Sequence, residues 1–202
     1  MAVDMAGNNQ AATTNNIEES YPLSPLQQGM LFHDLSAPHS GVDIEQVICR
    51  LPEEVNVAAF RQAWERALER HAILRTGFRW GGLQPRQEVH RRVRLQVEYK
   101  DWRGLTHREQ EGRLDAYLQA ERRRGFELSV PPLIRLALVH VEPAKYILAL
   151  TFHHLLLDGR GLVALLKEVF LLNEALCEKR HLELPPTRPY RRRPRWHPAR
   201  AR

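Results

Sequence analysis

The sequence predicts an α+β domain, organised as a layered α/β sandwich in which helices flank a mixed central sheet. Segments in which apolar residues alternate, as they do in strands, are interspersed along the chain with segments of helical periodicity. Two long apolar strands are joined by a short turn and followed by a strongly apolar helix. With 202 residues, 43% of them hydrophobic and 27% charged, the chain can bury one ordinary core.

Composition divides the chain into three parts. Residues 1–20 are rich in Asn, Ala and Thr without periodicity, so we expect a flexible leader. Residues 21–187 carry the periodic segments and form the expected domain. Residues 188–202 hold seven arginines and no acidic residue, so the net charge of +6 comes from this segment and the rest is nearly neutral. We therefore expect a solvated basic tail and no specific nucleic-acid binding.

The first expected helix is short and well marked. Ser24 and Gln27 fit a capping box, and Pro25 suits the first helical position. We expect its apolar stripe to consist of Leu26, Met30 and Leu31.

Strand and helix then alternate. Residues 42–51 alternate as a strand, and residues 56–71 have helical periodicity with Asn56 as the cap. Residues 74–80 and 95–102 are expected to be strands around a turn at two glycines. The buried side of the helix should consist of Phe60, Trp64, Ala67 and Leu68.

The second half of the domain contains the expected core. Thr106 and Glu109 form a second capping box, which opens a long charged helix. Residues 133–141 and 145–154 follow as an antiparallel pair of strands, and residues 159–176 as an apolar helix.

Two adjacent histidines end the last strand. Because side chains alternate along a strand, His153 and His154 should point to opposite faces. An imidazole open to a cleft can take a proton from an amine or a hydroxyl. A histidine on an apolar face can equally be a buried, hydrogen-bonded structural residue, and periodicity does not separate the two interpretations.

The residues after the histidines are equally open to interpretation. Asp158 could orient a base, pair with an arginine or cap the helix that begins at Gly159. Gly159 and Gly161 permit either a tight turn or the close approach of a ligand.

Several classes of protein are not expected. No apolar run approaches the roughly 20 residues of a membrane span, and the N-terminus lacks the basic start and apolar centre of a secretory signal, so we expect a cytoplasmic protein. Cys49 and Cys177 lie far apart and belong to no metal-ligand motif. We therefore expect reduced thiols and no metal site.

Three motifs together identify a family. The segment HHLLLDG, residues 153–159, has the form HHxxxDG, and it lies downstream of SPLQQGMLFH, residues 24–33, and RHAILRTGF, residues 70–78. In this order and spacing the three resemble the opening motifs of condensation domains from nonribosomal peptide synthetases. HHxxxDG alone recurs in a wider superfamily that includes chloramphenicol acetyltransferase. The resemblance implies the N-terminal lobe of a chloramphenicol acetyltransferase-like fold.

The resemblance also implies roles for the motif residues. In the family the second histidine faces the reaction channel and the first supports it, which gives the catalytic role to His154 and the structural role to His153. Asp158 is expected to pair with an arginine, and Arg75 lies at the matching place. Gly159 is expected to bring a backbone N–H near the substrate.

The implied reaction joins an acyl or peptidyl thioester, held on a carrier protein's phosphopantetheine arm, to the amine of an aminoacyl group on a second carrier. The implied partners are therefore carrier proteins, and no cofactor is bound directly. Family members have two similar lobes, so we expect a second lobe to be missing and this chain to be inactive alone. A non-catalytic carrier-binding module and a homo-oligomeric acyltransferase are the alternatives. We interpret residues 188–202 as an out-of-frame tail or as the end of an authentic short protein.

Overall fold

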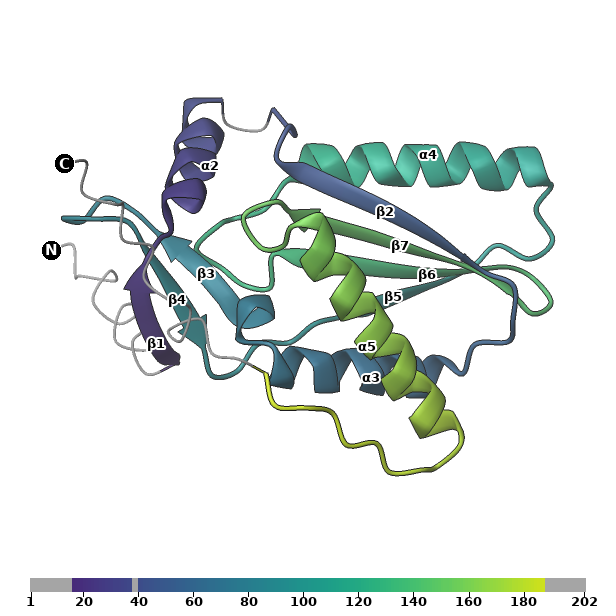
Figure 1. Cartoon of the computed structure of the whole chain (residues 1–202). Coiled ribbons are helices and arrows are strands. Elements are labelled where there is room, and N and C mark those ends of the chain that lie inside the picture. The colour runs from purple at the N-terminus through teal and green to yellow at the C-terminus, as the bar shows by residue number, and fades with distance from the viewer. Residues whose placement is uncertain (1–15, 38–39, 188–202) are drawn as a thin grey trace, which may run out of the picture.

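The computed structural model describes residues 16–37 and 40–187, which form two sheets with helices packed around the larger one (Figure 1). The first element is strand β1 (Ile17–Pro22). The expectation of a flexible leader through residue 20 is therefore wrong at its end, because Ile17, Glu19 and the residues after them pair with a neighbouring strand. The basic segment expected at residues 188–202 lies outside the described residues.

The larger sheet has four strands in the order β2 (Ile44–Leu51), β7 (Lys145–His153), β6 (Ile134–Glu142) and β5 (Val97–Asp101). β7 runs antiparallel to both β2 and β6, whereas β5 and β6 are parallel. The sheet is therefore mixed, as the sequence predicts.

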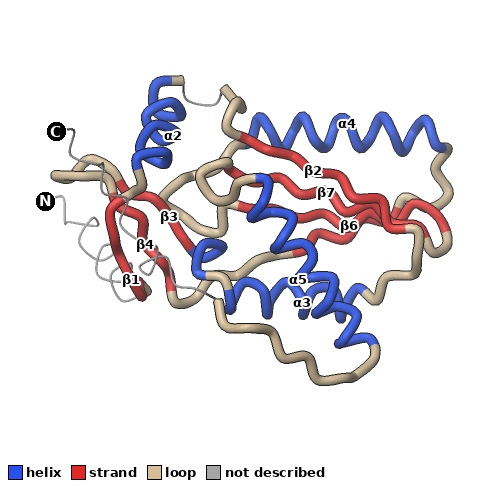
Figure 2. The backbone as a smooth tube through the Cα atoms, in the orientation of Figure 1, coloured by secondary structure: helices blue, strands red, loops and turns tan. Residues whose placement is uncertain are grey.

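A second sheet was not predicted. Its strands are antiparallel in the order β1, β4 (Arg86–His90) and β3 (Thr76–Arg79), and they stand apart from the larger sheet (Figure 2). Strand β4 was missed because its sequence, RQEVH, is polar, although Gln87 is fully buried. Because β4 pairs with β3, the strands predicted at residues 74–80 and 95–102 belong to different sheets.

Helices cover both faces of the larger sheet (Figure 1). On one face, α3 (Val57–Arg70) and α5 (Gly159–Cys177) pack together over the main core. On the other face, α4 (His107–Arg124) covers a smaller apolar cluster. The predicted buried side of α3 is confirmed, and so are the helix caps at Asn56 and Thr106.

Helix α2 (Pro25–Ser36) begins as predicted but packs differently. Ser24 and Gln27 form the expected capping box. Of the predicted apolar stripe, Leu31 is buried and Met30 is partly buried, but Leu26 is 70% exposed. The prediction for Leu26 is wrong because α2 lies beyond the end of the larger sheet, where only a narrow side of the helix meets the core (Figure 1). No helix within the described ranges is both long and apolar enough to cross a bilayer.

Candidate functional site

The two histidines lie where β7 ends and the turn toward α5 begins. β7 ends at His153, one residue earlier than predicted, and His154 is the first residue of the turn. The backbone N–H of His153 donates to the carbonyl of Leu133 at 3.0 Å, and that of His154 donates to the carbonyl of Asp43 at 2.8 Å. Both main-chain positions are thus fixed by neighbouring segments.

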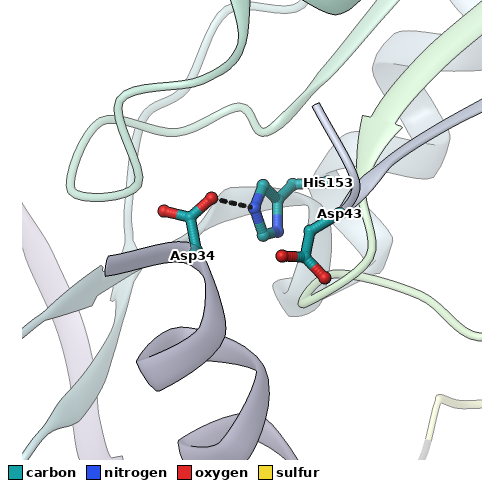
Figure 3. Close-up of side chains that lie close together, drawn as sticks. All are labelled: Asp34, Asp43 and His153. Atoms are coloured by element: carbon teal, nitrogen blue, oxygen red, sulfur yellow. Dashed lines mark hydrogen bonds and ion pairs between the residues drawn. The ribbon is translucent and has the colours of Figure 1, made fainter. Parts of the chain in front are cut away.

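His153 is a buried residue with both ring nitrogens engaged. Its exposure is 1%. The backbone N–H of Leu155 donates to Nδ1 at 3.2 Å, so Nδ1 carries no proton in this arrangement. The proton of the neutral ring is therefore on Nε2, which lies 3.2 Å from Oδ1 of Asp34 and donates to it (Figure 3). This geometry fits the supporting role expected for the first histidine.

His154 has the opposite tautomer. The residue is half-buried, and its Nδ1 lies 3.2 Å from the carbonyl oxygen of Leu157. Because a carbonyl only accepts hydrogen bonds, Nδ1 carries the proton and donates, and Nε2 of the neutral ring keeps its lone pair. Nε2 makes no hydrogen bond to any residue that the structure describes. It can accept a proton, or donate one when the ring is charged.

The expected ion pair between Asp158 and Arg75 does not form. Asp158 is exposed, and its Oδ1 accepts the backbone N–H of Gly161 at 2.6 Å, which makes it the N-cap of α5. Of the roles left open by the sequence, the structure selects helix capping.

Arg75 instead joins the smaller sheet to α3. Its guanidinium donates to the carbonyls of Leu68 and His90 and pairs with Glu18 at 2.7 Å. The expectation fails because Arg75 ends a short 3₁₀ turn, η1 (Ala72–Arg75), beside β1 and β4, where these carbonyls and Glu18 satisfy its donors.

The two glycines of the turn differ. At Gly159 an added Cβ would meet no atom within 4 Å, whereas at Gly161 it would lie 3.1 Å from Oδ1 of Asp158. The backbone N–H of Gly159 belongs to the first turn of α5, where N–H groups have no partner within the helix. Its contact with a substrate stays a prediction.

Two aspartates that the sequence reasoning missed flank His153 (Figure 3). Ligand atoms of Asp34, Asp43 and His153 all lie within 4.8 Å of one another, as in some metal sites. A metal would need the lone pair of one ring nitrogen of His153, but the N–H of Leu155 already occupies that of Nδ1 and thereby keeps the proton on Nε2. The cluster therefore fits a hydrogen-bond network better than a metal centre.

Neither of two surface cavities is lined by His153 or His154. One, of about 290 Å³, lies between the start of α4 and the β6–β7 hairpin, at the far end of β7 from His153. The other, of about 440 Å³, lies beside Arg75 and two exposed arginines. We place the candidate site at His153 and His154 because there a ring nitrogen that can accept a proton lies within the HHxxxDG segment.

Comparisons with known proteins identify the family of the chain. A family model described as Condensation domain matches residues 17–201, and so includes most of the basic segment that we expected to depart from the family. One of the linear gramicidin synthase proteins of Brevibacillus parabrevis is 49% identical over 144 residues, which are 71% of this chain and 3% of that protein. Bacitracin synthase 3 of Bacillus licheniformis is 33% identical over 174 residues, 86% of this chain and 3% of that protein.

Solved structures show the same fold. The starter condensation domain of rhizomide synthetase RzmA superposes with a TM-score of 0.74 at 22% identity, covering 81% of this chain and 41% of that one. A four-domain nonribosomal peptide synthetase bound to AMP and glycine gives a TM-score of 0.67 at 18% identity, covering 77% of this chain and 12% of that one. The chain thus spans well under half of each solved chain.

Proposed function

The chain belongs to the condensation-domain family of nonribosomal peptide synthetases, and from that membership we propose that it supplies the N-terminal half of an amide-forming domain. The amine nitrogen of an aminoacyl thioester attacks the carbonyl carbon of an acyl or peptidyl thioester. A C–N bond forms, the C–S bond breaks, and the amine proton leaves with the thiol of the donor arm. Both substrates are held on phosphopantetheine arms of carrier proteins, which are the proposed partners.

The open Nε2 of His154 is the observation that carries this proposal. A thioester is already activated, so the protein must chiefly orient two substrates and manage one proton and a developing oxyanion. Nε2 with its lone pair can accept the amine proton as the C–N bond forms, and the resulting imidazolium can then hand it to the departing thiolate. His153, buried and doubly hydrogen-bonded, supports the turn that carries His154.

The second half of the domain is the other proposed partner. Helix α2 exposes large apolar side chains: Phe32 is 74% and Leu35 41% exposed, three positions apart on neighbouring turns, and Leu26 is 70% exposed on another side. Adjacent exposed large apolar side chains, such as Phe32 and Leu35, are typical of a surface that another element covers. α2 lies beyond the end of the larger sheet at which β7 ends, so an element packed on it would also help to wall the histidines (Figure 1).

A chimera tests this proposal. Residues 1–187 would be fused to the segment that follows the matched region in the gramicidin synthase relative, and supplied with a donor carrier bearing an acyl thioester and an acceptor carrier bearing an aminoacyl thioester. We expect mass spectrometry to detect the condensed product on the acceptor carrier with the chimera, and none with the 202-residue chain alone.

Three outcomes would contradict parts of the proposal. Robust turnover by the unaccompanied chain would remove the need for a second half and favour a homo-oligomeric acyltransferase. Carrier binding by a folded chimera without any product would favour a non-catalytic binding module. A folded chimera that neither binds carriers nor condenses their substrates would reject both.

A further inference from the structure

Asp34 reaches the motif histidines from a distant part of the sequence. It lies near the C-terminal end of α2, and its Oδ1 is 3.2 Å from Nε2 of His153, 119 positions further along the chain (Figure 3). The Asp34 side chain is 30% exposed, whereas that of His153 is 1% exposed. The carboxylate therefore satisfies a buried N–H that water reaches poorly.

His153, held by Asp34, in turn forms hydrogen bonds with the turn that follows it. Its Nδ1 accepts the backbone N–H of Leu155 at 3.2 Å, and its carbonyl accepts that of Leu156 at 2.9 Å. The same turn ends at Leu157, whose carbonyl accepts Nδ1–H of His154. The position of the carbonyl that fixes the His154 tautomer thus depends on how His153 is held.

A second tie from α2 acts on the other side of His154. Nδ1 of His33 lies 2.8 Å from Oδ2 of Asp43, and the backbone carbonyl of Asp43 accepts the N–H of His154 at 2.8 Å. Neighbouring residues of α2, His33 and Asp34, are thus connected to the main chain of His154 and to the ring of His153.

We propose that Asp34 is a positioning residue, which holds His153 in its Nε2–H tautomer and thereby keeps Nε2 of His154 unprotonated and open. Its effect on the reaction rests on the proposed function, but its effect on the two tautomers does not. A carboxylate is suited to this role because it is an acceptor only, so it cannot stabilise the alternative His153 tautomer in which Nε2 would be the acceptor.

Nitrogen-15 NMR of the ring nitrogens tests the tautomers on the chain as it is. At mildly alkaline pH we expect His153 as the Nε2–H tautomer and His154 as the Nδ1–H tautomer. Asp34→Ala should move the ring shifts of both histidines toward the averaged values of an unanchored imidazole. Asp34→Asn, which keeps an acceptor oxygen, should preserve most of the wild-type pattern. Asp115→Asn, the same change on the exposed side of α4, should alter neither ring.

The opposite tautomer of either ring in the wild-type chain would overturn the proposal, even if Asp34→Ala failed to fold. So would an Asp34→Ala chain with unchanged ring shifts.

In the active chimera, Asp34→Ala should lower kcat by about 10- to 100-fold with little change in KM for either carrier, and Asp34→Asn should recover most of the loss. Unchanged kcat in folded Asp34→Ala would contradict a positioning role. If the wild-type chimera were inactive while the tautomers behaved as expected, the proposed function would fail and the structural part of this inference would stand.

Discussion

Oδ1 of Asp158 accepts the backbone N–H of Gly161 at 2.6 Å, so the aspartate of the HHxxxDG motif caps α5 instead of pairing with Arg75. Arg75 has its own partners on β1, β4 and α3. Asp158 and Arg75, which the family resemblance pairs, therefore do not contact each other in this structure, and we expect no energetic coupling between them.

That separation predicts the effect of removing Asp158. Asp158→Ala should lower the free energy of unfolding by about 1 kcal/mol, the usual contribution of an N-cap. A double-mutant cycle with Arg75→Ala, measured by urea denaturation, should show coupling within about 0.5 kcal/mol of zero. A loss of about 3 to 5 kcal/mol with strong coupling would instead indicate a buried ion pair.

Arg75 should matter more for stability than Asp158. Its guanidinium satisfies two backbone carbonyls as well as Glu18, and its side chain is only 11% exposed. Arg75→Lys should cost about 2 to 3 kcal/mol, because an ammonium cannot reproduce the planar fork of donors. Glu18→Gln is the control: Glu18 is 42% exposed, so the loss should stay below about 1 kcal/mol. Equal losses in the two variants would show that the ion pair, and not the carbonyl contacts, dominates.

The glycine of the RTGF segment is required by a close chain crossing. At Gly77 an added Cβ would lie 2.8 Å from the carbonyl oxygen of Ser129 and 3.1 Å from Cδ of Pro131. The adjacent N–H of Phe78 donates to the carbonyl of Leu128 at 2.7 Å, so β3 could move away only by breaking this hydrogen bond. Gly77→Ala should therefore destabilise the chain by about 1 to 3 kcal/mol in thermal or urea unfolding.

Gly82→Ala is the matched control for this substitution. An added Cβ at Gly82 would meet no atom within 4 Å, and we expect a change within about 0.5 kcal/mol. If Gly77→Ala were as stable as Gly82→Ala, the crossing of β3 by residues 128–131 would be looser than the structure shows.

Local signals predicted more of this fold than of its site. The capping boxes at Ser24 and Thr106 depend on residues three positions apart, so the sequence alone locates both helix starts. Strand β4 lacks the apolar alternation by which strands are recognised, because the polar Gln87 stands at a buried position. Its side chain can be buried there because it hydrogen-bonds to Gln27 and to the carbonyl of Pro22. The partner of Asp34 is 119 positions away, and no spacing rule reports such a contact.

A tyrosine at the far end of the larger sheet predicts alkaline sensitivity. Tyr146 is 3% exposed, and burial, followed by its hydrogen bond to Glu54 at 2.6 Å, raises its pKa from 10.0 to about 12. Between these values the unfolded chain has lost the phenolic proton while the folded chain retains it, so rising pH favours unfolding. The contribution of Tyr146 to the free energy of unfolding should therefore be fully present below about pH 10 and be lost as the pH rises toward about 12.

Urea denaturation between about pH 9 and about pH 11 measures this effect. Tyr146→Phe removes the ionisation, so its stability should fall less steeply with pH than that of the wild type. A shallow slope should remain, because burial also raises the pKa of Tyr117. Parallel slopes in the two proteins would show that Tyr146 ionises alike in both states.

The rate of product formation by the chimera carrying His154→Ala, compared with His153→Ala, tests the central claim most directly. Loss of the proton acceptor should slow condensation by about 100-fold or more, while the melting temperature of His154→Ala stays within a few degrees of the wild type. His153→Ala should instead lower the melting temperature, because it leaves the N–H of Leu155 without its ring acceptor inside the protein. Full condensation activity in a folded His154→Ala chimera would contradict the account.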